Sequence, residues 1–316
     1  MEIMSFSSRV KDELSLQCPP ARHCQIAETA AIISICGRVQ ISENGRYMVK
    51  IHTENLVVAR KYFTLLKKAY NIDTEISVRR SVAAKVYTVA VKKHEDALRI
   101  LKASKLIDGS GEICENLSVS DNLIIQKECC KRAFIRGAFL ASGSISDPEK
   151  FYHFEIVCST EGKARQLKNM ITCFQIDAKI VERKRHFVVY VKDGTGIVDI
   201  LNVMEAHVSL MELENVRILK EMRNSVNRKV NCETANLHKT VSAAVKQIED
   251  IRYIESTKGL SVLSESLEEI ARLRLENPDA SLKELGEMLS VPVGKSGVNH
   301  RLRKLSQIAE ELRGRL

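Results

Sequence analysis

A basic segment near the carboxyl end of the chain has the residue types and spacing that bind nucleic acid. Between Val291 and Leu305 there are four lysines or arginines and no acid. Val298, Leu302 and Leu305 recur at helical spacing and predict a helix with one buried side. Arginine and asparagine on its other side carry the donors that recognise base edges in a major groove. The predicted DNA-binding residues of this helix are Lys295, Ser296, Asn299, His300, Arg301, Arg303 and Lys304.

Two shorter helices are predicted to position this segment. The first ends before Pro278, and Ser281 with Glu284 forms an S-x-x-E capping box that opens the second. Gly286 is small enough for a close helix crossing, and a turn with proline and glycine precedes the third helix. This order predicts a helix-turn-helix over about 264–313, with Ser281 among the DNA-binding candidates. The alternative is an ordinary helical hairpin with a solvated basic face.

The first two thirds of the chain contain an internal repeat. Segments that begin at Ile51 and Cys158 share T-E, then A-R, then a helical stretch ending in I-D, then a basic β-like stretch and a final V-K. Each copy follows the order helix, strand, helix, hairpin, which predicts an α+β domain with antiparallel sheets. The helix in front of each copy is rich in alanine, glycine and serine. We expect these two helices to pack on one another, the alternative being two separate buried helices.

Basic residues occur at matched places in the two copies. Residues 46–93 hold eleven lysines or arginines against three acids, and residues 163–193 hold eight against three. Such hairpins are candidates for contacts to DNA phosphates, or else are solvated tips that keep sheet edges soluble. The candidate backbone contacts are Arg79, Arg80, Lys85, Arg183, Lys184 and Arg185.

The nine cysteines predict no metal site and no cofactor. No two of them have the C-x-x-C spacing of a structural zinc site, so we interpret them as small, buried apolar residues. The sequence also has no Ser-His-Asp arrangement, no P-loop and no G-x-G-x-x-G nucleotide motif.

Five segments resemble known protein families. "FIRGAFLASGSI" (134–145) and, less closely, "ETAAIISICG" (28–37) look like the LAGLIDADG helix of homing endonucleases. "SFSSRVKDEL" (5–14), "NCETANLHKTVSAA" (231–244) and "KSGVNHRLRKL" (295–305) resemble the WhiA family of bacterial regulators, along essentially the whole chain. The resemblance implies a degenerate two-repeat LAGLIDADG-like domain joined to a helix-turn-helix domain. It implies DNA-binding regulation linked to sporulation, cell division or chromosome segregation.

The LAGLIDADG resemblance allows one test of nuclease chemistry. In such nucleases, an acid before the terminal glycine of each helix binds the divalent metal. The corresponding residues here are Cys36 and Ser142, and neither supplies the hard carboxylate oxygen that Mg²⁺ requires. We therefore predict that the chain is not an enzyme and has no catalytic residues.

Composition agrees with a DNA-binding protein. The 316 residues are 44% hydrophobic and 28% charged, with a net charge of +9 that suits a polyanionic partner. No apolar run is long enough for a membrane span, and the charged first residues do not fit a signal peptide, so we expect a cytoplasmic, nucleoid-associated protein. The expected partners are double-stranded DNA and RNA polymerase or another regulator, with no membrane, and the internal pseudo-dyad favours a monomer.

The predicted organisation has five parts, and two alternatives to its function are open. The parts are an N-terminal extension (1–20), a first repeat (21–115), a second repeat with a closing helix (116–226), a linker (227–233) and a helical DNA-binding domain (234–316). The alternatives are an active site-specific endonuclease and a basic module that binds protein or RNA.

Overall fold

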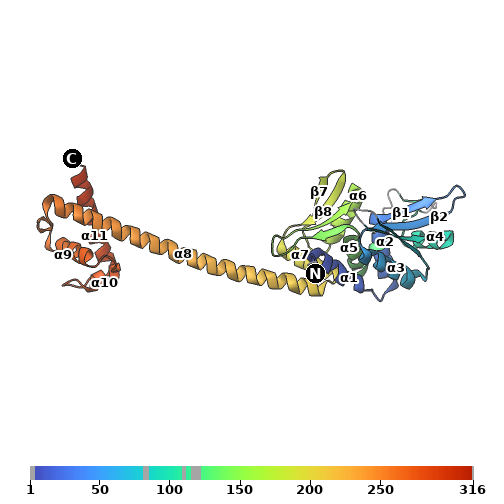
Figure 1. Ribbon diagram of the computed structural model, residues 1–316, viewed down its shortest axis with the longest axis horizontal. Helices are drawn as coiled ribbons and strands as arrows, with labels where there is room; N and C mark the ends of the chain where they lie inside the picture. Colours follow the sequence, from blue (N-terminus) through green and yellow to red (C-terminus); the bar gives the residue numbers. More distant parts are fainter. Residues whose placement is uncertain (1–3, 81–84, 109–111, 115–121, 315–316) are drawn as a thin grey trace. The chain divides into compact units, whose positions relative to one another are not determined.

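The computed structural model describes residues 4–80, 85–108, 112–114 and 122–314 (Figure 1). The chain divides into two compact units, Met1–Lys220 and Glu221–Leu316. The predicted α+β class with antiparallel sheets, followed by an all-helical region, is confirmed. None of the helices in the described ranges is long and apolar enough to cross a membrane.

The first unit contains the repeat twice. After helix α1 (Phe6–Leu16), the first copy consists of α2 (Arg22–Cys36), β1 (Gly37–Ile41), β2 (Tyr47–Thr53), α3 (Leu56–Tyr70), β3 (Glu75–Arg80), β4 (Lys85–Val91) and α4 (His94–Ala103). The second copy follows the short 3-10 helix η2 (Asn122–Ile125) and consists of α5 (Glu128–Ser142), β5 (Gly143–Ile145), β6 (Phe154–Cys158), α6 (Glu161–Thr172), β7 (Lys179–Arg183), β8 (His186–Val191) and α7 (Gly194–Met204). The short strands β1 and β5 are additional to the strands that the sequence predicted.

The two sheets have matching topologies. Their strand orders are β1-β2-β4-β3 and β5-β6-β8-β7, and all neighbouring strands are antiparallel. Val49 and Ile51 of β2, and Phe154 and Ile156 of β6, are fully buried and pack into one apolar core with the helices. Side chains at alternate positions point away from that core, so each sheet has a second face that is accessible to a partner.

Helices α2 and α5 pack directly on one another, as the small residues in their sequences predicted. Ala30, Ala31 and Ala138 are fully buried in the shared core. A Cβ atom on Gly137 would lie 2.6 Å from the carbonyl oxygen of Glu28, so only glycine permits this approach of the two backbones. The pair brings the two repeats together.

Helix α8 (His207–Lys258) corrects the predicted linker. It has 52 residues and continues without a break through 227–233, where the sequence suggested a joint. The helix contains neither glycine nor proline, and it ends before Gly259, whose φ of +77° stops helical geometry. Its start packs in the first unit through Leu213, and its end packs in the second through Ile251 and Ile254.

The second unit is entirely helical. It consists of the continuation of α8, the short 3-10 helix η3 (Leu260–Val262), α9 (Glu265–Glu276), α10 (Leu282–Glu287) and α11 (Lys295–Arg313). Its core joins Ile251 and Ile254 of α8 to Ile270 of α9, Leu285 of α10 and Leu302 of α11. The three last helices are those that the sequence predicted for the helix-turn-helix.

Candidate nucleic-acid interface

Helix α11 has one buried side and one exposed polar side. Val298, Leu302, Leu305, Ala309 and Leu312 are buried against α8, α9 and α10. The exposed candidates are Lys295, Ser296, His300, Arg303 and Lys304, whereas Asn299 and Arg301 on the flanks are half-buried. Within the described part of the chain, none of Lys295, Arg303 and Lys304 forms an ion pair. Their charges are therefore available to an external anion, although their role in DNA binding stays a prediction.

The capping box that the sequence predicted is present. The Ser281 hydroxyl oxygen accepts a hydrogen bond from the Glu284 backbone N–H at 3.3 Å, and the Ser281 N–H donates to Glu284 Oε2 at 2.7 Å. These hydrogen bonds hold the pKa of Glu284 below its usual value. Ser281 is exposed, and its first role is to start α10.

Gly286 fixes the turn between α10 and α11. Its carbonyl accepts a hydrogen bond from the Val293 N–H at 3.1 Å, and a Cβ at this position would lie 2.2 Å from the Val293 carbonyl oxygen. Gly286 thus permits a close approach, but to the Val293 carbonyl of the turn and the Val298 side chain of α11, and not to the backbone of another helix as the sequence suggested.

Two residues that sequence reasoning missed support this turn. Arg274 is buried and donates to the carbonyl oxygens of Pro278 and Ala280, at 3.3 and 2.7 Å, which ties α9 to the start of α10. Glu269 accepts from the Ser290 N–H at 2.6 Å. That bond and the positive charge of Arg301 lower the pKa of Glu269. Arg301 therefore lies near an acid of its own unit, whereas Arg303 forms no ion pair with any residue that the structure describes.

Lys295 and Asn299 also line a groove within the second unit. The groove has a volume of about 910 Å³ and lies between α8, residues 278–283 and the start of α11. Its charged lining residues are Lys239, Lys283 and Lys295, together with Arg274 and Asp279. Lysines thus surround the point where α11 begins, which is the end of a helix that favours anions.

The outer face of the first sheet carries a basic cluster. Arg38 of β1 pairs with Lys50 of β2, and both point away from the core because Val49 and Ile51 point into it. Burial, and then the charges of Lys50 and Arg38, lower the pKa of His52 on the same face. Arg79, in register with Val86, extends this outer face along β3. Arg80 and Lys85 pair with one another and are exposed, but strand alternation places them on the opposite face of the sheet. Residues 81–84 at the tip lie outside the described residues.

The second sheet has a different outer face. Glu155 lies in its middle, where it accepts from Ser144 at 3.1 Å, contacts His153 at 3.1 Å and lies 3.9 Å from Arg183. Lys184 and Arg185 occupy the two-residue turn between β7 and β8 with φ of 48° and 67°, which is unusual for residues other than glycine. The candidate residues Arg79, Arg80, Lys85 and 183–185 are exposed, but the two sheets differ in charge because Glu155 lies near Arg183. The contacts of these candidates to DNA phosphates stay a prediction.

The two positions that hold acids in LAGLIDADG nucleases lie at the carboxyl ends of α2 and α5. The Cys36 thiol donates to the Ile32 carbonyl at 3.2 Å, and the Ser142 hydroxyl donates to the Val157 carbonyl at 2.7 Å. Burial raises the pKa of Cys36 to about 12, so the thiol is neutral at neutral pH. Lys11 of α1 lies beside it, and its ammonium is 5.7 Å from the Phe139 ring centre. Two neutral side chains and a lysine make this end unsuitable for Mg²⁺.

A buried group of charges lies at the middle of the same helix pair. Glu28 of α2 contacts Lys61 at 3.0 Å and Arg136 of α5 at 3.2 Å, and Arg136 contacts Glu205 at 2.6 Å. Burial lowers the pKa of Lys61, which Glu28 partly offsets. Burial also acts to lower the pKa of Arg136, but Glu28 and Glu205 outweigh it and raise the pKa. Two acids and two bases balance, so these cations are not available to DNA.

The amino-terminal ends of α2 and α5 bring together four potential metal ligands. The ligand atoms of His23, Cys24, Cys129 and Cys130 all lie within 4.8 Å of one another. The expectation of no metal site rested on spacing along the chain, which does not detect candidate ligands that come from adjacent pairs on two helices. The matched position of the two pairs in the two repeats was the available signal.

Comparison with known proteins identifies the family. Three family models match: WhiA N-terminal LAGLIDADG-like domain at residues 22–107, WhiA LAGLIDADG-like domain at 131–223 and WhiA C-terminal HTH domain at 226–309. A relative from Lachnoclostridium phytofermentans, named probable cell division protein WhiA, is 55% identical over 98% of this chain and 100% of its own length. The chain belongs to the WhiA family.

Further relatives agree with this result. A WhiA protein from Lachnospira eligens with the same name is 50% identical and covers 98% of both chains. The crystal structure of full-length DUF199/WhiA from Thermatoga maritima matches with a TM-score of 0.59 and 24% identity, over 98% of this chain and 99% of that one. At that identity the likeness supports the WhiA fold alone. The LAGLIDADG-like repeats and the helix-turn-helix that the sequence predicted are confirmed.

Proposed function

We propose that this chain is a sequence-specific DNA-binding transcriptional regulator. The observation that carries the proposal is the exposed side of α11, where Lys295, Arg303 and Lys304 lack ion-pair partners among the described residues. A helix of this kind, placed third in a helix-turn-helix, enters the major groove. Arg303 is the candidate for guanine recognition, and Asn299 for adenine. Lys295 and Ser296, at the start of α11, suit a phosphate.

The first sheet supplies additional contacts in this proposal. Arg38, Lys50 and Arg79 share an outer face and suit DNA phosphates, which position a protein without reading sequence. Glu155 makes the second sheet a weaker contributor, so its hairpin residues 183–185 contact phosphates only at their exposed tip. We propose that a monomer binds in this way, because its two repeats already supply the internal pseudo-dyad.

We also propose that the bound protein does not cut DNA. Metal-assisted hydrolysis requires oxygen ligands that hold a divalent ion at the scissile phosphate. Cys36 and Ser142 offer a neutral thiol and a neutral hydroxyl, both already bonded to main-chain carbonyls, and Lys11 adds a positive charge. Regulation then follows from occupancy, through recruitment or exclusion of RNA polymerase or another regulator.

The biological setting is inferred from the relatives. Because they are named probable cell division proteins, we propose that the regulated genes or chromosomal sites belong to cell division. Chromosome segregation and sporulation are the other settings that the family resemblance implies. Action on the chromosome places the protein in the cytoplasm, associated with the nucleoid.

Genome-wide occupancy of the wild type and of an Arg301→Ala, Arg303→Ala double variant tests this function. Discrete peaks in the wild type and their loss in the variant are expected, while a matched Arg272→Ala variant keeps them. Arg272 is the matched control because it is exposed on α9 and, among the described residues, forms an ion pair with Glu268 of the same helix alone. Purified protein incubated with Mg²⁺ and a duplex from a peak should leave the duplex intact.

Two results would overturn the proposal in different ways. Peaks that persist in the double variant would place recognition in the first unit or in a protein partner. Cleavage that depends on Mg²⁺ would instead support the endonuclease alternative.

A further inference from the structure

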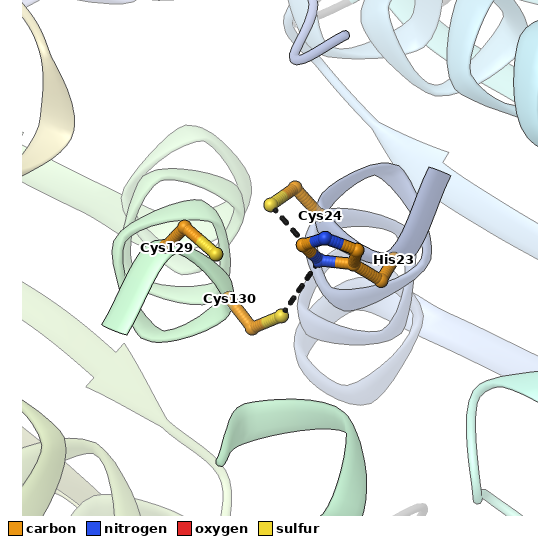
Figure 2. Close-up of side chains that lie close together, drawn as sticks. All are labelled: His23, Cys24, Cys129 and Cys130. Atoms are coloured by element: carbon orange, nitrogen blue, oxygen red, sulfur yellow. Dashed lines mark hydrogen bonds between the residues drawn. The ribbon is translucent and has the colours of Figure 1, made fainter. Parts of the chain in front are cut away.

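The four ligand residues at the helix pair occupy equivalent places in the two repeats. His23 and Cys24 lie in the first turn of α2, and Cys129 and Cys130 lie in the first turn of α5. Figure 2 shows the four side chains in the space between the two helix ends, with the imidazole next to two of the sulfurs. His23 Nδ1 is 3.2 Å from Cys130 Sγ and 3.3 Å from Cys24 Sγ.

The packing of the helices explains why these residues meet. Cys24 and Cys130 are buried in a small cluster of their own with Ala27 and Ala133, separate from the main apolar core. The alanines lie one turn further along each helix, and their small side chains let the two backbones approach closely at this end. Cys129 and His23 are exposed, so a metal ion has access to the cluster from solvent.

The ligand types select one class of metal. Three thiols and one imidazole form the Cys₃His set of structural zinc sites, whereas Mg²⁺ and Ca²⁺ require oxygen ligands. Zinc–sulfur bonds of about 2.3 Å place the sulfur atoms of a tetrahedral site about 3.8 Å apart. The four ligand atoms here lie within 4.8 Å of one another, so small side-chain rotations would bring them to that spacing. An iron–sulfur cluster would hold its thiolates further apart than one ion does.

Burial raises the pKa of the free Cys24 and Cys130 thiols, but the two helix ends favour the negative charge that a metal–thiolate group would carry. Both residue pairs lie in the first turn of a helix, where the backbone carries partial positive charge. The N-cap residues Ala21 and Lys127 make no side-chain capping bond, so these N–H groups are not used by a capping side chain. A site with three thiolates around a divalent cation has a net negative charge, which this position stabilises.

We propose that His23, Cys24, Cys129 and Cys130 bind one Zn²⁺ ion that clamps the amino-terminal ends of α2 and α5. Four protein ligands leave no open position for water or substrate, so the ion has a structural role. The ion would join α2 and α5 at their amino-terminal ends, whereas the buried Glu28–Arg136 contact joins the same two helices near their middle. The proposal is independent of DNA binding, because it concerns only how the two repeats are held together.

Metal analysis of the full-length protein tests the site. Protein purified without oxygen and without chelators is expected to contain one zinc per chain. Cys129→Ser is expected to lose most of it, because an exposed position tolerates serine while one thiolate is removed. Cys232→Ser, which changes an exposed cysteine of the second unit, is the matched control and should keep the full content.

Cobalt binding by the wild type provides a second readout that needs no variant. Metal-free protein titrated with Co²⁺ alone should saturate at one ion per chain, with the thiolate-to-cobalt charge transfer and visible bands of a tetrahedral, sulfur-rich site. Zinc at equal concentration should remove these bands. Chelation should lower the unfolding temperature of the first unit in the wild type, and not in Cys129→Ser.

Defined results would overturn the proposal. Zinc contents that are far below one per chain and equal in the wild type and Cys129→Ser would exclude the site. Octahedral cobalt spectra without charge transfer would do the same. A disulfide between Cys24 and either cysteine of α5, found by mass spectrometry in protein whose reduced form binds no metal, would assign these residues to a redox bond instead.

Discussion

The core of the first unit and the exposed side of α11 in the second unit use positive charge in opposite ways. In the first, Lys61 and Arg136 are buried and bonded to acids, and Lys163 is buried with its ammonium on the Ser34 carbonyl. In the second, Lys295 and Arg303 are exposed. Net charge alone therefore does not locate a DNA-binding surface. What matters is which cations already have an internal partner, because those hold the fold and the others remain for phosphates and bases.

The largest expected effect is on the buried charges of the first unit. Glu28→Gln leaves two buried cations without their shared carboxylate and should lower the free energy of unfolding by about 3–5 kcal/mol. Denaturant unfolding, followed separately for the two units, measures it. Glu161→Gln, which removes an exposed partner of Arg165, should cost under about 1 kcal/mol. Equal losses in both variants would show that the buried group does not stabilise the helix pair.

A smaller effect is expected at the turn of the second unit. Gly286→Ala places a Cβ 2.2 Å from the Val293 carbonyl oxygen, and the shift it forces should lower the free energy of unfolding of that unit by about 1–3 kcal/mol. Gly294→Ala is the control: a Cβ there meets no atom within 4 Å, so the only expected loss is the smaller one of replacing glycine by alanine at the N-cap of α11. A Gly286→Ala protein as stable as the control would mean that the turn is not held in this conformation.

The smallest effect is expected at the capping box. Ser281→Ala should lower the free energy of unfolding of the second unit by about 1 kcal/mol.

The same capping box predicts a pH dependence of stability. Hydrogen bonds lower the pKa of Glu284 in the folded protein, so Glu284 stabilises the second unit above the usual pKa of a glutamate. This stabilisation is lost as the pH falls through the lowered pKa. Unfolding measured between neutral and acidic pH should show this dependence in the wild type and less of it in Glu284→Gln. If Glu284→Gln has the same pH profile as the wild type, the hydrogen bonds of the capping box do not lower the pKa of Glu284.

Local patterns in the sequence predicted the second unit well. Ser281 and Glu284 are three residues apart, and Val298, Leu302 and Leu305 repeat along one helix, so neighbouring residues alone specified the elements. The prediction of a linker at 227–233 also rested on a local pattern, and it was wrong. Its polar composition suggested a loop, but without glycine or proline nothing stops α8 there.

Contacts between distant residues were not predictable in the same way. Glu28 and Arg136 are 108 residues apart, and the four zinc-site candidates come from two helices more than 100 residues apart. The repeat predicted that α2 and α5 pack together, but not which side chains meet. Glu155 shows the same limit, because one acid in the middle of a sheet makes two repeats with similar basic composition electrostatically different.

The most direct test of this account compares exposed cations of α11 with an exposed cation of α9 on one DNA. A duplex from an occupied site is titrated with wild type, Arg303→Ala, Lys295→Ala and Arg272→Ala proteins at several salt concentrations. Arg303→Ala should lose about 1–3 kcal/mol of binding, or about 5- to 150-fold in affinity, and Lys295→Ala should reduce the salt slope by about 1. Arg272→Ala should bind like wild type. If both α11 variants also bind like wild type, the claim that the exposed cations of α11 contact DNA is wrong.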